Sequence, residues 1–146
     1  MALHVARSYP ELVRAAREAE NNDSPAEAAA LYEQAKRQEP HHEMIYNRLM
    51  ILYRKLKQYD DELRVIREGI KAFESLHEER TQRIYKGNGK VKQLSSQLAK
   101  SLGQSDRKGK QLVHPEPVNR WLARQGTVEE KIARQKTKKT KTKKKK

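Results

Sequence analysis

The stretch SPAEAAALYEQAKRQEP, residues 24–40, decides the fold. Ser24 and Glu27 are spaced as a capping box, and a proline in the first helical turn costs nothing because its missing N–H has no partner there. Small and aromatic side chains then recur at helical spacing, namely Ala28, Tyr32 and Ala35. The stretch therefore predicts one helix, followed at Pro40 by a turn.

The same pattern recurs 34 residues further along the chain. When residues 9–42 are laid on residues 43–76, apolar positions fall on apolar ones and small residues on small ones. The matched pairs are Leu12 with Tyr46, Ala15 with Leu49, Ala16 with Met50, Ala19 with Tyr53, Pro25 with Tyr59, Tyr32 with Ile66, and Ala35 with Gly69. A period of this length is that of a helix–turn–helix repeat, so we expect two helical hairpins.

Neighbouring segments carry matching helix signals. Ser8 and Glu11 form another capping box, and residues 21–23 are expected to make the turn between the first two helices. Apolar residues recur at helical spacing in the third and fourth helices, at Met44, Ile45, Leu49, Leu52 and Leu56 and at Leu63, Ile66, Ile70 and Phe73. Residues 1–76 are therefore predicted to form four helices in two hairpins.

The repeat resembles the tetratricopeptide (TPR) family over residues 9–76. The likeness is carried by Ala28, Tyr32, Ala35 and Pro40 in the first unit and by Tyr46, Leu49, Tyr53 and Tyr59 in the second. It implies an all-α, TPR-like array of helical hairpins, an α-solenoid that binds other proteins. Glu62 stands where the family has a small residue and Glu74 where it has proline, so we expect the second hairpin to pack less tightly or to end differently.

Two hairpins need a cover, because a repeat array usually buries a continuous core only from about three units. We expect residues 77–103 to form a degenerate capping hairpin that is broken at residues 87–89. A third full repeat would bury Arg80 and Arg83, which argues against one. After the break a stripe recurs at helical spacing, formed by Val91, Leu94, Leu98 and Leu102. Self-association is the alternative way to cover the array.

Charge divides the chain into two regions. Residues 1–76 hold 12 Lys and Arg against 13 Asp and Glu, whereas residues 77–146 hold 21 against 6. The net charge of +14 therefore comes entirely from the second half. We interpret residues 104–134 as a linker with short helices, one of them opened by a capping box at Thr127. Residues 135–146 are predicted to be a disordered, lysine-rich tail.

The sequence gives no support to catalysis, a metal or a cofactor. It has no cysteine, which excludes thiolate zinc sites and cysteine nucleophiles, and no glycine-rich phosphate loop or catalytic triad can be recognised. His41 and His42 are adjacent and are interpreted as exposed turn residues, since a metal site needs three or four convergent ligands. Without a secretory signal or a spanning segment, we expect a non-enzymatic protein of the cytoplasm, or of the nucleus in a eukaryote.

The TPR resemblance implies a partner-binding groove on the first helix of each hairpin. The groove positions that it implies are Arg14, Arg17, Asn47, Arg48, Ile51, Arg54 and Lys55. Only one carboxylate, Glu20, is expected among these cations. The groove would therefore favour an acidic peptide or protein segment, because arginine offers two donors to a carboxylate. The alternative is that these are ordinary solvated helix charges.

Two features lie outside the repeat. Trp121 is expected to dock on the helical array or to contact a partner, with docking favoured.

The tail lysines form a sequence-independent phosphate ligand. They make association with RNA or DNA, for example with the ribosome, the alternative function. They are Lys136, Lys138, Lys139, Lys141, Lys143, Lys144, Lys145 and Lys146. Because no aromatic or arginine side chain is interleaved with them, they would add affinity but little specificity.

Overall fold

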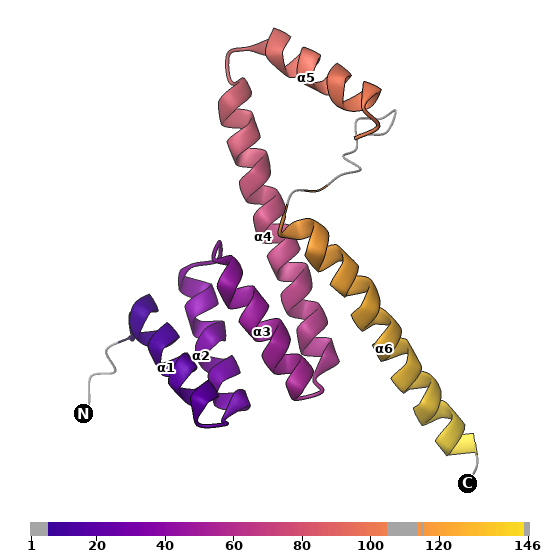
Figure 1. Ribbon diagram of the computed structural model, residues 1–146. Helices are drawn as coiled ribbons and strands as arrows, with labels where there is room; N and C mark the ends of the chain where they lie inside the picture. Colours follow the sequence, from indigo (N-terminus) through magenta and orange to yellow (C-terminus); the bar gives the residue numbers. More distant parts are fainter. Residues whose placement is uncertain (1–5, 105–113, 115, 145–146) are drawn as a thin grey trace.

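The computed structural model describes residues 6–104, 114 and 116–144, and within them the chain is helical apart from turns and connections (Figure 1). No strand occurs among these residues, which confirms the all-α class. The helices are α1 (Tyr9–Asn21), α2 (Pro25–Gln38), α3 (Glu43–Lys55), α4 (Tyr59–Tyr85), α5 (Gly89–Ser101) and α6 (Val118–Lys144).

Helices α1 to α4 pack as consecutive neighbours, α1 on α2, α2 on α3, and α3 on α4. Their apolar faces meet in one core, as the helical spacing predicts. Buried positions include Leu12, Ala16 and Ala19 of α1, Ala28, Tyr32 and Ala35 of α2, Ile45, Tyr46 and Leu49 of α3, and Val65, Ile66 and Ile70 of α4. The four helices predicted for residues 1–76 are therefore present.

The α1–α2 and α3–α4 turns have the same hydrogen bonds, 34 residues apart. The Ser24 N–H donates to the Ala19 carbonyl and the Gln58 N–H to the Tyr53 carbonyl, both at 2.9 Å. Between them lie Asp23 and Lys57, at φ 56° and 58°, in the left-handed conformation that closes this kind of helix end. The structure thus repeats at the period found in the sequence.

The starts of α1 and α2 differ. The Ser8 N–H donates to the Glu11 carboxylate at 3.2 Å, and the capping box of α1 is present. Ser24 makes no side-chain capping bond, so the capping box expected for α2 is wrong. Because Pro25 already fixes the backbone of the first turn, α2 begins without that bond.

Helix α4 is almost twice as long as its counterpart. Helix α2 has 14 residues and ends before Pro40, whereas α4 has 27 residues. The residue 34 positions after Pro40 is Glu74, which keeps its N–H and does not clash with the preceding turn. The helix therefore continues to Tyr85, and residues 77–85 extend α4 instead of forming a separate helix of a capping hairpin.

Helix α5 does not cover the second hairpin, contrary to the expectation for residues 77–103. The break before it is present, with Gly87 at φ 81°, but α5 has no buried residue. Its tie to α4 includes a 2.7 Å hydrogen bond from the Tyr85 hydroxyl to Ser95 Oγ. Since the added turns of α4 project beyond the other helices, they carry α5 away from the core (Figure 1).

Helix α6 provides the cover instead. It runs antiparallel to α4: His114, just before α6, lies beside Glu74, Trp121 lies over Gly69, and Lys131 lies over the ring of Tyr59. Its buried residues Val118, Trp121 and Val128 complete the core. The array is therefore closed by a segment far along the chain, since Trp121 follows Gly69 by 52 residues.

The described part of the basic extension is one helix, not a linker with short helices followed by a disordered tail. Gly126 and Thr127 lie inside α6, so the capping box expected at Thr127 is wrong. The docked first half supplies the helix nucleus, and later residues need only extend it. Three hydroxyls also donate to carbonyls four residues earlier, those of Thr137, Thr140 and Thr142.

Gly69 is the point of closest approach between α4 and α6. A Cβ atom at this position would lie 3.0 Å from both the Trp121 and the Tyr46 rings. Trp121 is 1% exposed and also packs edge-on against Phe73, with 5.2 Å between ring centroids. The absence of a side chain at position 69 is therefore what lets the indole reach the core.

Two glycine substitutions should have opposite effects. Gly69→Ala should lower the free energy of unfolding by about 1–3 kcal/mol, because the new methyl group overpacks the indole site. Gly126→Ala meets nothing within 4 Å and should raise it by up to about 1 kcal/mol through helix propensity. Urea unfolding followed by circular dichroism measures both. A shift of both variants in the same direction would contradict the packing described.

Candidate partner-binding face

The predicted groove residues lie on α1 and α3, on a surface that we call the α1–α3 face. It consists of Arg14, Arg17, Asn47, Arg48, Ile51, Arg54 and Lys55. On α1, Arg14, Arg17 and Glu20 follow at three-residue spacing and so share one side of the helix. On α3, the five members recur within one side at spacings of one, four, seven and eight from Asn47.

Ion pairs join the two helices of this face. The Arg48 guanidinium donates through Nε to Glu20 Oε1 at 3.0 Å and through Nη2 to the other Glu20 oxygen. Lys55 Nζ of α3 lies 3.2 Å from Oδ1 of Asp23, which is in the turn after α1. The expectation of a single carboxylate among the cations is therefore wrong, since Asp23 and a buried glutamate of α4 also approach them.

That glutamate is Glu62, which the sequence marked only as a departure from the repeat pattern. Its side chain is 0% exposed, and its Oε1 accepts hydrogen bonds from two arginines. Arg54 Nη2 lies at 3.2 Å and Arg124 Nε at 2.8 Å. We call Glu62, Arg54 and Arg124 the buried charge cluster. It ties α3, α4 and α6 together and holds two positive charges against one negative.

Asn47 is also engaged by α6 and is not free to bind a peptide. The Trp121 indole Nε1–H donates to Asn47 Oδ1 at 2.9 Å, and Arg120 forms an ion pair with Glu43 at the start of α3. Sequence reasoning missed Arg124 and the role of Asn47 because α6 was not placed beside α3. Glu62, which stands where the repeat pattern has a small residue, was the one sequence feature that could have indicated this contact. A buried carboxylate needs a cationic partner.

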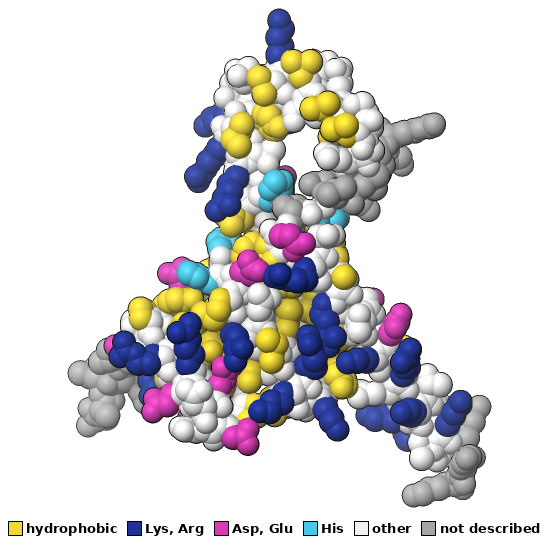
Figure 2. All heavy atoms as spheres, in the orientation of Figure 1, with side chains coloured by type: hydrophobic (Ala, Val, Ile, Leu, Met, Phe, Trp, Pro, Cys, Tyr) yellow, Lys and Arg dark blue, Asp and Glu magenta, His cyan; other side chains and the backbone are white. Residues whose placement is uncertain are grey.

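What remains open on the face is a mixed cationic and apolar surface. Arg14 and Arg17 are exposed and form no ion pair among the described residues, and Ile51 is 45% exposed. A hollow of about 160 Å³ lies beside Ile51, lined by Glu20, Pro25, Arg48, Ile51, Leu52 and Lys55. Figure 2 shows Lys and Arg side chains interspersed with hydrophobic ones over the body formed by α1 to α4.

The pKa of Tyr32, a buried residue of α2, is raised. Burial is the largest cause that raises the Tyr32 pKa, and the Glu20 charge adds to it. The positive charges of Arg48 and Arg17 oppose this shift. The hydrogen bond to Glu20 raises the pKa of Arg48 in turn. Arg48 therefore keeps its positive charge beside Glu20.

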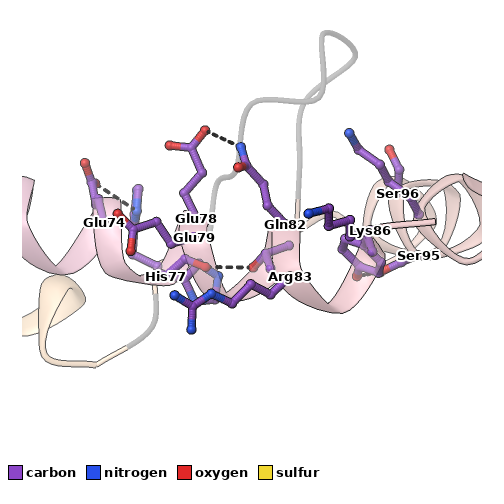
Figure 3. Close-up of a pocket in the computed structure, with 13 residues that line it drawn as sticks. Glu74, His77, Glu78, Glu79, Gln82, Arg83, Lys86, Ser95 and Ser96 are labelled. Atoms are coloured by element: carbon purple, nitrogen blue, oxygen red, sulfur yellow. Dashed lines mark hydrogen bonds and ion pairs between the residues drawn. The ribbon is translucent and has the colours of Figure 1, made fainter. Parts of the chain in front are cut away.

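A larger cavity of about 1090 Å³ lies between the projecting end of α4 and α5 (Figure 3). Its lining includes side chains of both charges, among them Glu74, His77, Lys86 and Lys92.

Within the described residues no group of three His, Cys, Asp or Glu side chains is arranged to hold a metal ion. His42 and His41 lie beside the rings of Tyr9 and Phe73, respectively, with centroid distances of 4.9 and 6.3 Å.

Most of the tail lysines lie in the second half of α6. Lys136, Lys138, Lys139, Lys141 and Lys143 are exposed, Lys144 ends the helix, and Lys145 and Lys146 lie outside the described residues. Among the described residues, no helix is long and apolar enough to cross a membrane.

Comparison with protein-family models, curated proteins and solved structures gives no match to this chain.

Two arginine substitutions in α6 compare the contribution of the buried charge cluster to the free energy of unfolding with that of a surface ion pair. Arg124→Met should lower the free energy of unfolding by about 3 kcal/mol, because it leaves the buried Glu62 with one partner fewer. Arg120→Met removes a pair whose side chains are both about half exposed and should cost less than about 1 kcal/mol. Chemical unfolding at neutral pH measures the difference. Equal losses would show that Glu62 does not depend on Arg124.

Proposed function

We propose that this chain is a non-catalytic adaptor of the tetratricopeptide type, which binds an acidic peptide or protein segment on the α1–α3 face. The family proposal is supported by the sequence repeat and by the two turns that repeat each other's hydrogen bonds 34 residues apart. The binding proposal is supported by one observation above all. A large aliphatic side chain, Ile51, is exposed among arginines next to a hollow.

Helix α6 supports a solenoid reading of the whole domain. Its buried Trp121 and Val128 are seven residues apart, as are Tyr46 and Tyr53 in α3 and Leu12 and Ala19 in α1. Trp121 also lies over Gly69, the position that matches Ala35 in the repeat. We therefore interpret α6 as the first helix of a third, unfinished unit, reached after the long insertion that contains α5.

The free and the paired cations of the face have different roles in this proposal. Arg14 and Arg17 would bind carboxylates of the ligand directly, since they have no ion-pair partner among the described residues. Arg48 is held by Glu20, so a ligand carboxylate must compete with an internal one for it. An apolar ligand side chain would contact Ile51. The face would therefore prefer a segment with several carboxylates around one apolar residue.

A second function, binding of a polyanion such as RNA or DNA, is supported by the form of the tail. Lysines at 136, 138, 139, 141 and 143 lie on several sides of a helix that projects past the docked region (Figure 1). Such a helix attracts phosphate groups from any direction and selects weakly among them. In this proposal it adds electrostatic affinity to the adaptor.

The face can be tested with a short fluorescein-labelled peptide of glutamates around one leucine. Arg14→Glu/Arg17→Glu should weaken its binding roughly tenfold or more, because two charge-assisted contacts are lost. The matched control is Arg37→Glu/Lys71→Glu, which changes the net charge equally at exposed positions outside the face. Fluorescence anisotropy measures the dissociation constants.

A further variant separates the two functions. Replacing the eight tail lysines by glutamine should leave most of the peptide affinity in place. If that variant loses the peptide while Arg14→Glu/Arg17→Glu keeps it, the tail is the binding site and the adaptor proposal is wrong. Equal weakening by the control pair would show that only net charge matters.

A further inference from the structure

Helix α5 and its C-terminal cap Leu102 have an apolar stripe that is exposed in the described part of the structure. At about 100° per residue, Val91, Leu94, Leu98 and Leu102 fall within roughly 80° of one another around the helix. Leu94 is 65% exposed, and Leu98 and Leu102 are similar. Figure 2 shows hydrophobic side chains gathered over this end of the molecule. A helix of 13 residues that buries none of them has little stability of its own, and contact with a further surface would stabilise it.

The charges around the stripe are of one sign. From Arg80 to Gln104 the chain has six cations and no carboxylate. Lys90 lies about 80° from the middle of the stripe on one side, and Lys92 lies about 120° from it on the other side, where it also lines the cavity between α4 and α5. Long lysine side chains in such positions keep their ammonium groups in a polar layer while their stems follow the apolar one. The arrangement therefore matches a surface that is apolar inside and negatively charged outside.

The position of α5 fits a broad surface. The projecting turns of α4 carry it to one end of the molecule, away from α1, α2 and α3 (Figure 1). Ile84, at the end of α4, is 72% exposed and adds an apolar side chain there. A second copy of α5 is a poor occupant, because pairing would bring lysines together with no carboxylate between them.

We propose that α5 binds the surface of an anionic lipid bilayer, with its leucines in the interface and its lysines among the lipid headgroups. The helix lies in the plane of the surface and does not cross it. Its stripe is narrow and lacks aromatic residues, so binding is reversible and needs both the apolar contact and the negative charge. This site is separate from the α1–α3 face and does not rest on the function proposed for it.

The test uses the absence of cysteine, which allows a single environment-sensitive fluorophore to be placed on Val91→Cys in the full chain. Emission should shift to the blue with vesicles of phosphatidylcholine and phosphatidylserine, and not with phosphatidylcholine alone. Leu94→Ser/Leu98→Ser should weaken this response about tenfold or more, because it removes apolar contact without changing charge. Gln93→Ser, about 140° from the middle of the stripe around α5, is the control and should leave it unchanged.

Because the fluorophore reports only its own position, attraction of the tail lysines to the vesicles does not mimic the result. A label on Gln93→Cys should stay in water. The proposal is overturned if the Val91 label does not shift, if the Gln93 label shifts equally, or if the serine pair leaves the response intact. A shift with soluble polyglutamate but not with vesicles would also overturn it, in favour of an acidic protein partner.

Discussion

The contact of Trp121 with Gly69 is the constraint on which the rest of the structure depends. The α3–α4 hairpin has aromatic side chains on its outer side, and a helical hairpin cannot bury that side alone. Trp121 covers Tyr46 and Phe73, with ring centroids 5.4 and 5.2 Å away, and it can do so only because residue 69 has no side chain. Its indole N–H is satisfied by Asn47, so the largest side chain of the core enters it without an unpaired donor.

The buried charge cluster fixes how α6 lies on that contact. Apolar packing alone would tolerate a small slide or rotation of α6, whereas Glu62 accepts from Arg54 and Arg124 in one arrangement. The carboxylate is fully buried, so losing either cation leaves it poorly compensated. The same cluster shapes the candidate face, because Arg54 is paired with Glu62, whereas Arg14 and Arg17 form no ion pair among the described residues.

Residues 1–76 could be predicted closely because their information is local. Helical spacing and the 34-residue period indicated four helices, and the structure has them. The remainder depended on contacts that spacing does not encode. The apolar stripe of α5 predicts an amphipathic helix but does not indicate what covers it. The sequence of residues 86–117 does not indicate that α6 packs against α4. Disorder was expected from Gln135 because composition cannot show that a docked helix precedes it. Glu62 and Glu74, the two departures from the repeat, proved to be the informative residues. Glu62 binds Arg124 of α6, and Glu74 allows α4 to continue beyond the length of α2.

Quenching of Trp121 fluorescence tests the docking of α6 most directly, because Trp121 is the only tryptophan in the chain. In the native full-length protein its emission should lie in the blue, and acrylamide should quench it weakly. Urea should move the emission to the red in the same transition that removes the helical circular dichroism, since α6 closes the same core. A red-shifted, readily quenched tryptophan in the native protein, or a shift that precedes the loss of helix, would contradict the account.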